Sequence, residues 1–271
     1  VYDNNNVTTN ISVIDQQVTE SFAFLITGHW LNGSVGEDRK NISGAIHCFF
    51  NTFKNKKNKP ALILKTSGAT YSVVDRMEIE SRIEQIKELF PNTKLPSIYL
   101  LHGDLTNKEM NALYNHSKIK AMISFTKSEG FGRPLLEFAS TGKPIIAPYY
   151  SGYTEFLCEL PGQLTPIHKT AQNEFLIKDA KWFSIDYNFA SNMLIDMMKN
   201  YKKWKEQAKR QRYHVRTNFT KQQISKLYKN IINIINTKMK DVPQQVGLKL
   251  PKLKSVKQEL PKLKLPKLQK T

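Results

Sequence analysis

Short blocks of apolar residues recur along the chain up to about residue 150 and are separated by longer segments of mixed pattern. Each block is only a few residues long and is bounded by glycine, proline or polar residues, which is typical of a buried strand. We therefore predict five strands, at residues 22–28, 61–66, 97–103, 121–125 and 144–148.

Between these blocks, apolar residues return at every third or fourth position, which is the spacing of an amphipathic helix. This pattern predicts a helix that begins near Lys40 and another over 79–90 that Pro91 would stop. Thr106-x-x-Glu109 has the form of a capping box and predicts the start of a further helix.

Strands that alternate with helices at this spacing imply right-handed crossovers and a mostly parallel sheet with helices on both faces. The predicted fold class is α/β, a Rossmann-like doubly wound domain whose ligand should bind beyond the carboxyl ends of the strands. After Ser184 the pattern indicates helices only, with apolar stripes along 189–204 and 224–235. We expect these stripes to be core or docking faces.

The net charge of +18 is unevenly distributed and helps to divide the chain. We predict a polar segment at 1–20, a folded domain with closing helices at 21–240, and a tail at 241–271. The tail holds eight lysines and two acidic residues, and its prolines at 251, 261 and 266 favour an extended conformation. It could solubilise the protein, or it could contact DNA, another acidic partner or a membrane surface. It has no aromatic side chain on which single-stranded bases could stack.

The remaining composition excludes several classes of protein. Two cysteines are too few for a disulfide scaffold and suit a reducing compartment. The sequence has no signal peptide and no apolar run of the roughly 18 residues that a membrane span requires, so we expect a cytoplasmic protein. The abundance of Asn, Lys and Ile fits an AT-rich genome, and a phage or viral origin, with a location in the host cytoplasm, is one interpretation.

The stretch SEGFGRPLLEFASTG, residues 128–142, lies between the fourth predicted strand and the next helix. Gly130 and Gly132 would let the backbone approach a ligand closely, and the N–H groups of Phe131 and Gly132 at a helix start would attract an anion such as phosphate. A tight turn can also require glycine for its geometry alone, so the glycines by themselves leave both interpretations open.

Two carboxylates, Glu129 and Glu137, flank this turn. They would repel a diphosphate and are better suited to accept hydrogen bonds from hydroxyl groups at the two ends of a ligand. A molecule with phosphates in the middle and a sugar at each end is a nucleotide-sugar.

The longer stretch SEGFGRPLLEFASTGKPIIAPYYSGYTEFL, residues 128–157, resembles the donor-binding signature of family 4 retaining glycosyltransferases, which have the two-domain GT-B architecture. LLHGDLTNKEMNALYNHS resembles the family segment that passes the nucleotide base, and GEDRKN at 36–41 resembles its first phosphate-binding loop. The resemblance covers roughly residues 22–235.

The resemblance implies a role for each matching residue. Glu129 would contact hydroxyls of the donor sugar, Glu137 would hold the ribose, and the turn Gly130–Gly132 would meet the diphosphate or the sugar. Lys40, or its neighbour Arg39, and Lys65 would neutralise the diphosphate as it leaves. For these three cations a solvated surface position is the alternative.

Three further residues are candidates for donor binding: His102, Gly103 and Glu155. His102 and His29 end predicted strands on the same rim, and a hydrogen-bonded structural role is the alternative for each. Capping or solvation is the alternative for Glu155. The sequence contains no Asp-x-Asp, the motif that binds a divalent ion in the other major transferase architecture, so we predict no metal.

We expect a metal-independent hexosyltransferase-type enzyme that retains configuration and transfers the sugar to a glycan, a lipid or modified phage DNA. The family carries its acceptor site on a separate N-terminal domain. Few residues precede the first predicted strand in this sequence, so a further domain or a partner chain is expected to supply that site. A non-catalytic nucleotide-sugar-binding or interaction module and a basic nucleic-acid-binding protein remain alternatives. A dehydrogenase is disfavoured because the loop after the first strand lacks Gly-x-Gly-x-x-Gly, and no P-loop is present.

Overall fold

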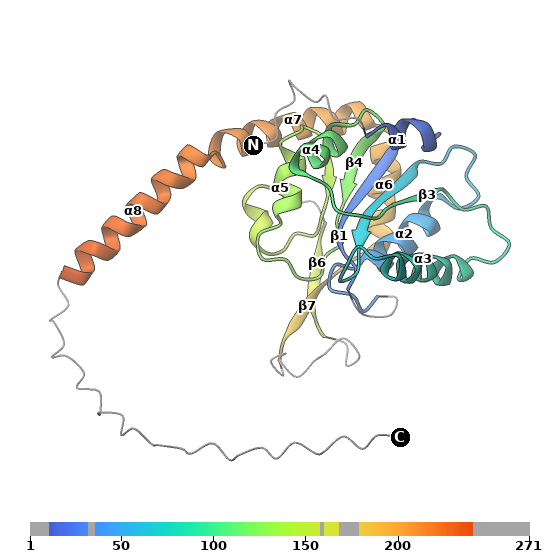
Figure 1. Cartoon of the computed structure of the whole chain (residues 1–271), viewed down its shortest axis with the longest axis horizontal. Helices are drawn as coiled ribbons and strands as arrows, with labels where there is room; N and C mark the ends of the chain where they lie inside the picture. Colours follow the sequence, from blue (N-terminus) through green and yellow to red (C-terminus); the bar gives the residue numbers. More distant parts are fainter. Residues whose placement is uncertain (1–10, 32–35, 158–159, 168–178, 241–271) are drawn as a thin grey trace, which may run out of the picture. The chain divides into compact units, whose positions relative to one another are not determined.

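The computed structural model describes residues 11–31, 36–157, 160–167 and 179–240 (Figure 1). The chain divides into two compact units, Val1–Ile224 and Ser225–Thr271, which are described separately. The predicted extended tail and the first half of the predicted polar segment lie outside the described residues.

The first unit is built on a five-stranded sheet in the order β3-β2-β1-β4-β5, and every neighbouring pair of strands is parallel. All five strands were predicted from their apolar runs, with ends that differ by a few residues. The strands are β1 (Ala23–His29), β2 (Ala61–Ser67), β3 (Ile98–Leu101), β4 (Ile119–Ile123) and β5 (Ile145–Ile146) (Figure 1).

Burial on both faces explains why these strands have continuous apolar runs. In β1, Phe24 and Ile26 belong to one hydrophobic cluster, whereas Ala23 and Leu25 belong to a second cluster. The other strands divide their side chains between the same two clusters. Each strand is therefore sandwiched between two apolar layers, as is usual for parallel sheets.

Helices on the two faces supply the remainder of the two clusters. Apolar side chains of α2 (Ile42–Phe53), α3 (Val73–Glu88) and α6 (Tyr187–Lys199) pack into the first cluster. Those of α1 (Ser12–Gln17), α4 (Asn107–Asn115) and α5 (Arg133–Ala139) pack into the second, and α7 (Tyr201–Asn218) packs against α5. The unit is thus doubly wound, as predicted.

The predicted helix boundaries have clear local causes. Thr106 and Glu109 form the predicted capping box at the start of α4: Glu109 N donates to Thr106 Oγ1 at 3.3 Å, and Thr106 N donates to Glu109 Oε2 at 2.7 Å. The helix α3 ends at Glu88, before Pro91, because proline cannot continue the hydrogen-bonding pattern.

The helix α1 and the strands β6 and β7 of the first unit were not predicted from the sequence. The helix α1 lies inside the predicted polar segment, where Ile14 and Val18 are each only 3% exposed. The strands β6 (Gly162–Pro166) and β7 (Lys181–Ile185) pair in antiparallel fashion and form a separate two-stranded sheet.

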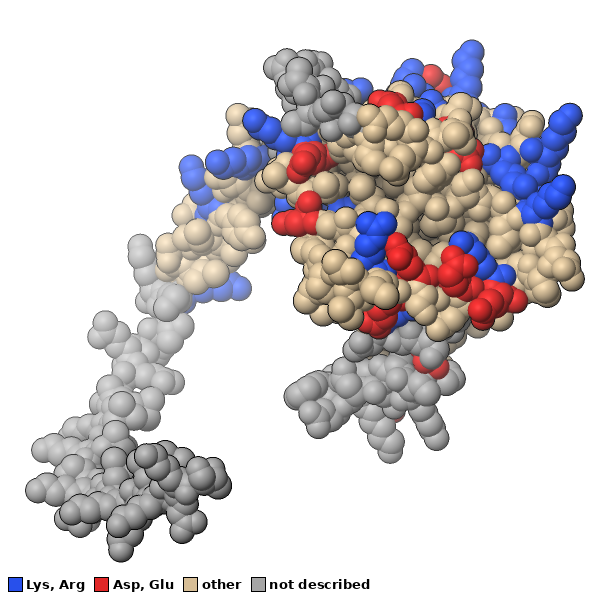
Figure 2. All heavy atoms as spheres, turned by 45° about the vertical axis from the view of Figure 1, so that its right-hand side comes forward, with Lys and Arg blue, Asp and Glu red and all other residues tan. Residues whose placement is uncertain are grey.

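The last helix, α8 (Lys221–Lys240), continues into the second unit. The apolar stripe predicted along it is not core: its large apolar side chains beyond Ile224 are about half exposed or more. Docking remains as the interpretation of this stripe. Lys and Arg lie among Asp and Glu over the face of the first unit shown in Figure 2, whereas α8 carries lysine and uncharged residues only.

Candidate functional site

The candidate site lies where the strand order reverses. From β1 the chain proceeds to β2 and β3 on one side of the sheet, whereas β4 and β5 lie on the other side. At such a switch point, a doubly wound sheet binds its ligand outside the carboxyl ends of the strands. The segment after β1 leads to Lys40, and the segment after β4 leads to Glu129.

Lys40 and Glu129 form an ion pair that joins these two segments, between Lys40 Nζ and Glu129 Oε2. The two side chains are 20% and 17% exposed, so the pair is largely shielded but open to a ligand. A methyl group built on Gly28 would lie 3.7 Å from Lys40 Cδ, so the lysine stem runs beside the end of β1. The structure thus brings together two residues that the sequence analysis assigned to the phosphate and the sugar.

Further bonds join the two loops beside this ion pair. Arg39 Nη1 donates to Ser128 O at 2.5 Å, and Lys127 N donates to Arg39 O at 2.9 Å. Lys127 Nζ donates to Gly36 O and lies 4.9 Å from the centre of the Trp182 ring. Arg39 therefore fastens the loops, which leaves Lys40 as the cation directed at Glu129.

Lys127 is a residue of the site that the sequence analysis missed. Burial lowers the pKa of Lys127, and the acidic side chains of Asp38 and Glu37 oppose that effect. Its place in the short segment between β4 and Glu129 is the signal that could have identified it.

The two glycines of the turn have different roles: the backbone conformation requires glycine at 132, whereas Gly130 leaves open space beside the backbone. Gly132 directly precedes the first residue of α5. Its φ of +78° is a backbone conformation that residues with a side chain rarely adopt. A methyl group on Gly132 would also lie 3.1 Å from the ring of Tyr153. A methyl group on Gly130, by contrast, would meet nothing within 4 Å. The exposed backbone at Gly130 therefore gives a ligand close access to the turn.

The turn rests on the short 3-10 helix η1 (Gly152–Glu155). A methyl group on Gly152 would lie 2.2 Å from Gly130 O, and Ser151 Oγ donates to Glu129 O. Tyr153 is fully buried beneath the turn, and burial together with the charge of Glu129 raises the pKa of Tyr153. This packing fixes both the turn and the backbone of Glu129.

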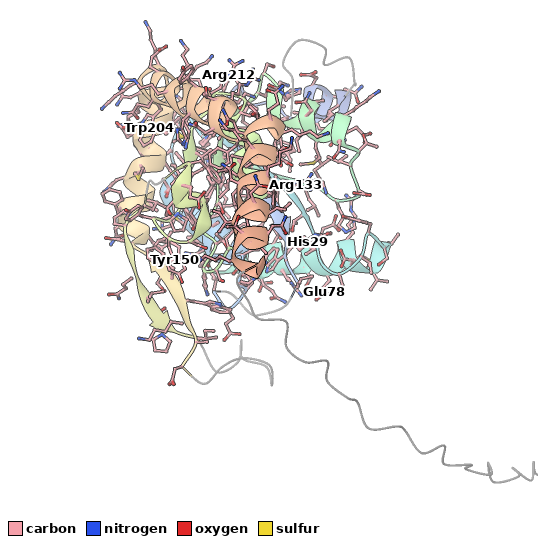
Figure 3. The ribbon with its side chains drawn as sticks, turned by 90° about the vertical axis from the view of Figure 1, so that its left-hand side faces the viewer. His29, Glu78, Arg133, Tyr150, Trp204 and Arg212 are labelled. Carbon is pink, nitrogen blue, oxygen red and sulfur yellow. The ribbon has the colours of Figure 1, made fainter. Side chains whose placement is uncertain are left out.

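The second predicted carboxylate, Glu137, faces Arg133 one helical turn earlier. Arg133 Nε lies 2.7 Å from Glu137 Oε1, and the two side chains are 75% and 15% exposed (Figure 3 labels Arg133). Glu137 is thus mostly shielded, whereas its partner Arg133 is largely exposed to solvent. Glu155 is exposed, and no ion pair of its carboxylate is found among the described residues.

Lys65 occupies the next strand on the other side of β1, opposite Thr27 in the register. Its Nζ donates to Gly103 O at 2.6 Å and lies 5.6 Å from the centre of the Tyr71 ring. Burial lowers the pKa of Lys65, and the nearby Asp104 carboxylate opposes that effect. The structure therefore joins Lys65 and Gly103, both predicted to contact the donor.

The two strand-end histidines have structural hydrogen bonds. His102 Nε2 lies 2.8 Å from Asp75 Oδ2, and the His102 side chain is only 5% exposed. His29 Nδ1 lies 3.0 Å from Ser67 Oγ (Figure 3). These hydrogen bonds support a structural role for both histidines. A contact between His102 and the donor stays a prediction.

A separate cavity of about 290 Å³ lies beside α7 and is lined by Pro144, Phe156, Trp204 and His214 among others (Trp204 is labelled in Figure 3). Pro144 is at the amino end of β5. The cavity is lined by none of the predicted site residues.

Within the described part of the chain, no group of three or more His, Cys, Asp or Glu side chains is placed to hold a metal ion. No helix among the same residues combines the length and the apolarity needed to cross a bilayer.

No protein-family model matches the chain, and no curated protein matches it significantly. Solved structures do match its fold. The C-terminal domain of a glycosyl transferase group 1 family protein (LpcC) from Francisella tularensis matches with a TM-score of 0.53 at 15% identity, over 81% of this chain and 96% of that domain. Anabaena HepE, in complex with UDP and glucose, matches with a TM-score of 0.53 at 14% identity, over 83% of this chain and 51% of HepE.

Sucrose-phosphate synthase from Thermosynechococcus elongatus matches with a TM-score of 0.52 at 15% identity, over 82% of this chain and 49% of the synthase. The chain thus spans about half the length of HepE and of the synthase, and nearly all of the LpcC domain. At these identities the likeness shows the fold, which is that of the C-terminal domains of GT-B glycosyltransferases. The predicted fold class is confirmed.

Proposed function

We propose that this chain binds a nucleotide-diphosphate sugar at the carboxyl ends of β1, β2 and β4 and donates the sugar in a glycosyl transfer reaction. UDP-sugars are the first candidates, because one structure of the same fold holds UDP and glucose. The assignment to family 4, the hexosyl nature of the sugar and the retention of configuration belong to this proposal.

One observation carries the proposal: the ion pair between Lys40 and Glu129 at the point where the strand order reverses. In the ligand-bound state the diphosphate oxygens replace the carboxylate as the partner of Lys40. The sugar hydroxyls then replace the ammonium group as the partner of Glu129. A ligand that carries phosphate next to sugar satisfies both charges at once, whereas phosphate alone leaves Glu129 without its partner.

The other residues extend this arrangement to the rest of the ligand. The open backbone at Gly130 and the turn that follows it meet the diphosphate or the sugar. Glu137 holds the ribose hydroxyls, and Gly103 lies beside the base. Lys65, half-buried next to Gly103, gives a second positive charge.

In the transfer step, the bond between the anomeric carbon and the terminal phosphate oxygen breaks, and its electron pair stays on the phosphate. Lys40 and Lys65 stabilise that developing charge, which is the role that fixed charges in a shielded site perform well. The acceptor hydroxyl oxygen bonds to the anomeric carbon, and its proton leaves to base or solvent. No metal ion is assigned a role, and the acceptor is a glycan, a lipid or modified DNA.

Thermal-shift measurements with UDP, GDP, ADP, CMP and their sugars test this proposal. One series should raise the melting temperature, since a ligand at 100 times its Kd contributes about 2.7 kcal/mol to stability. Lys40→Met should lose most of that shift. Lys87→Met, which removes an exposed lysine on α3, is the matched control and should keep it.

A second assay separates catalysis from binding alone. Release of free nucleotide from the preferred donor, measured with a panel of acceptors, reports transfer. Binding without release for any acceptor would support the alternative of a non-catalytic nucleotide-sugar-binding module. The absence of any stabilising nucleotide would refute the proposal.

A further inference from the structure

The helix α8 presents an unusual combination of exposed apolar and positively charged residues. Its large apolar side chains are between 48% and 64% exposed. They are Leu227, Tyr228, Ile231, Ile232, Ile234 and Ile235. The helix also contains five lysines and no acidic residue.

The apolar side chains gather on one side of the helix axis, and most of the lysines lie on the other side. At 3.6 residues per turn, the apolar side chains fall within roughly half of the circumference. The opposite half holds asparagine, glutamine, serine and threonine together with Lys226 and Lys229. The helix is therefore amphipathic, with Lys226 and Lys229 on the polar face, whereas Lys221 and Lys238 fall within the apolar half of the circumference.

We propose that α8 binds the surface of an anionic lipid bilayer, with its axis in the plane of the interface. The apolar side chains would enter the boundary between headgroups and acyl chains, and the lysines would reach the lipid phosphates. Tyr228 suits that boundary because its ring is apolar and its hydroxyl is polar. This inference goes beyond the proposed donor site and does not depend on it.

The charge pattern favours lipid over the other occupants of such a face. A second copy of α8 would bring two lysine-rich helices together with no acidic residue to pair with them. Nucleic acid would neutralise the lysines but leave the apolar side chains in water. An anionic bilayer satisfies the apolar half and the charged half together.

The sequence that follows α8 has the same chemistry. Residues 241–271 hold eight lysines and several leucines, with a net charge of +6 from eight lysines less two acidic residues. A basic segment directly after an amphipathic helix adds electrostatic attraction to an anionic surface. The helix does not qualify as a membrane span, so binding at the interface is the arrangement its composition allows.

Vesicle co-sedimentation of the full chain tests the proposal. Vesicles of phosphatidylcholine with 30% phosphatidylglycerol, roughly the content of an anionic membrane, should bind at least about tenfold more tightly than pure phosphatidylcholine. The double substitution Ile231→Ser with Ile235→Ser should weaken binding to the anionic vesicles by about tenfold or more. The pair Asn230→Ser with Asn233→Ser, on the polar face, is the matched control and should bind as the unmodified chain does.

Folding of each variant is checked by its circular dichroism, and its thermal shift with nucleotide is recorded separately. Three results would overturn the proposal: equal affinity for the two kinds of vesicle, full affinity after the isoleucine substitutions, or no binding to either. A change from dimer to monomer caused by the isoleucine substitutions, without vesicle binding, would instead assign the face to self-association. DNA binding that depends on the lysines, again without vesicle binding, would assign it to nucleic acid.

Discussion

Replacement of Glu129 by alanine should change the affinity for UDP and the affinity for a UDP-sugar in opposite directions. Glu129 should compete with a diphosphate for Lys40, because the two side chains form an ion pair. Without Glu129, Lys40 is available to the diphosphate from the start. UDP lacks the donor sugar and should therefore bind more tightly. A UDP-sugar, in contrast, loses the hydrogen-bond acceptor for the hydroxyls of its donor sugar.

The expected size follows from the exposure of the pair. Two charges about 4 Å apart attract by roughly 4 kcal/mol at an effective dielectric constant of 20. Because both side chains are about one-fifth exposed, solvent screening reduces the net value. We expect a gain for UDP of about 1.4 kcal/mol or less, which is up to tenfold in Kd. The lost hydrogen bond to the sugar should cost about 1.5–3 kcal/mol.

Calorimetric titration of UDP and of the preferred UDP-sugar measures both quantities. The preference for UDP-sugar over UDP should fall by about 10- to 150-fold in Glu129→Ala, which corresponds to the lost hydrogen bond. Glu80→Ala, which removes an equal charge from the exposed face of α3, is the control and should change neither constant appreciably. Weaker binding of UDP itself, or equal losses for both ligands, would refute the assignment of Glu129 to the sugar.

Three further predictions concern the turn, the ribose contact and a buried cation. Gly132→Ala should lower the free energy of unfolding by at least about 1–2 kcal/mol, because the residue is left-handed with φ of +78°; an unchanged urea midpoint would contradict this. Glu137→Ala should weaken UDP and UDP-sugar equally, by about 1.5–3 kcal/mol in titrations, and a selective loss of the sugar nucleotide would exclude the ribose contact. Burial lowers the pKa of Lys143 from 10.5 to about 7. The unfolded chain therefore binds more protons between these values, and stability should rise with pH from about 7 towards 10.5 by up to about 1.4 kcal/mol per pH unit. Lys143→Met should remove that rise in denaturation measured across the range.

The sheet was predictable from the sequence because each central strand is buried on both faces. Phe24 and Leu25 point to opposite clusters, yet both must be apolar, so the run shows no alternation. The hairpin β6–β7 lacks this signal: most of β6 is exposed, and it contains Gly162 and Pro166. Its pairing partner lies beyond a segment of more than ten residues, and such pairing is not encoded in local pattern.

The candidate site was predictable in part for a similar reason. The glycines and glutamates at 128–142 lie close together in the sequence, and their order marks the turn between a strand and a helix. The bond between Lys40 and Glu129 joins residues 89 positions apart, and only the strand order β1-β4 brings them together. The support of Gly130 by Gly152 likewise arises from tertiary packing, and the helix α1 is held by only a few buried side chains such as Ile14.

Hydrogen–deuterium exchange with the preferred nucleotide tests the central claim most directly, because it locates the ligand on the chain. We predict slower exchange in peptides that cover 36–42 and 127–133, the two loops that meet at the ion pair. Peptides that line the cavity beside α7, around Trp204 and His214, should be unchanged. Protection at α7 with none at 127–133 would contradict this prediction, because the nucleotide would then bind beside α7 and away from the ion pair.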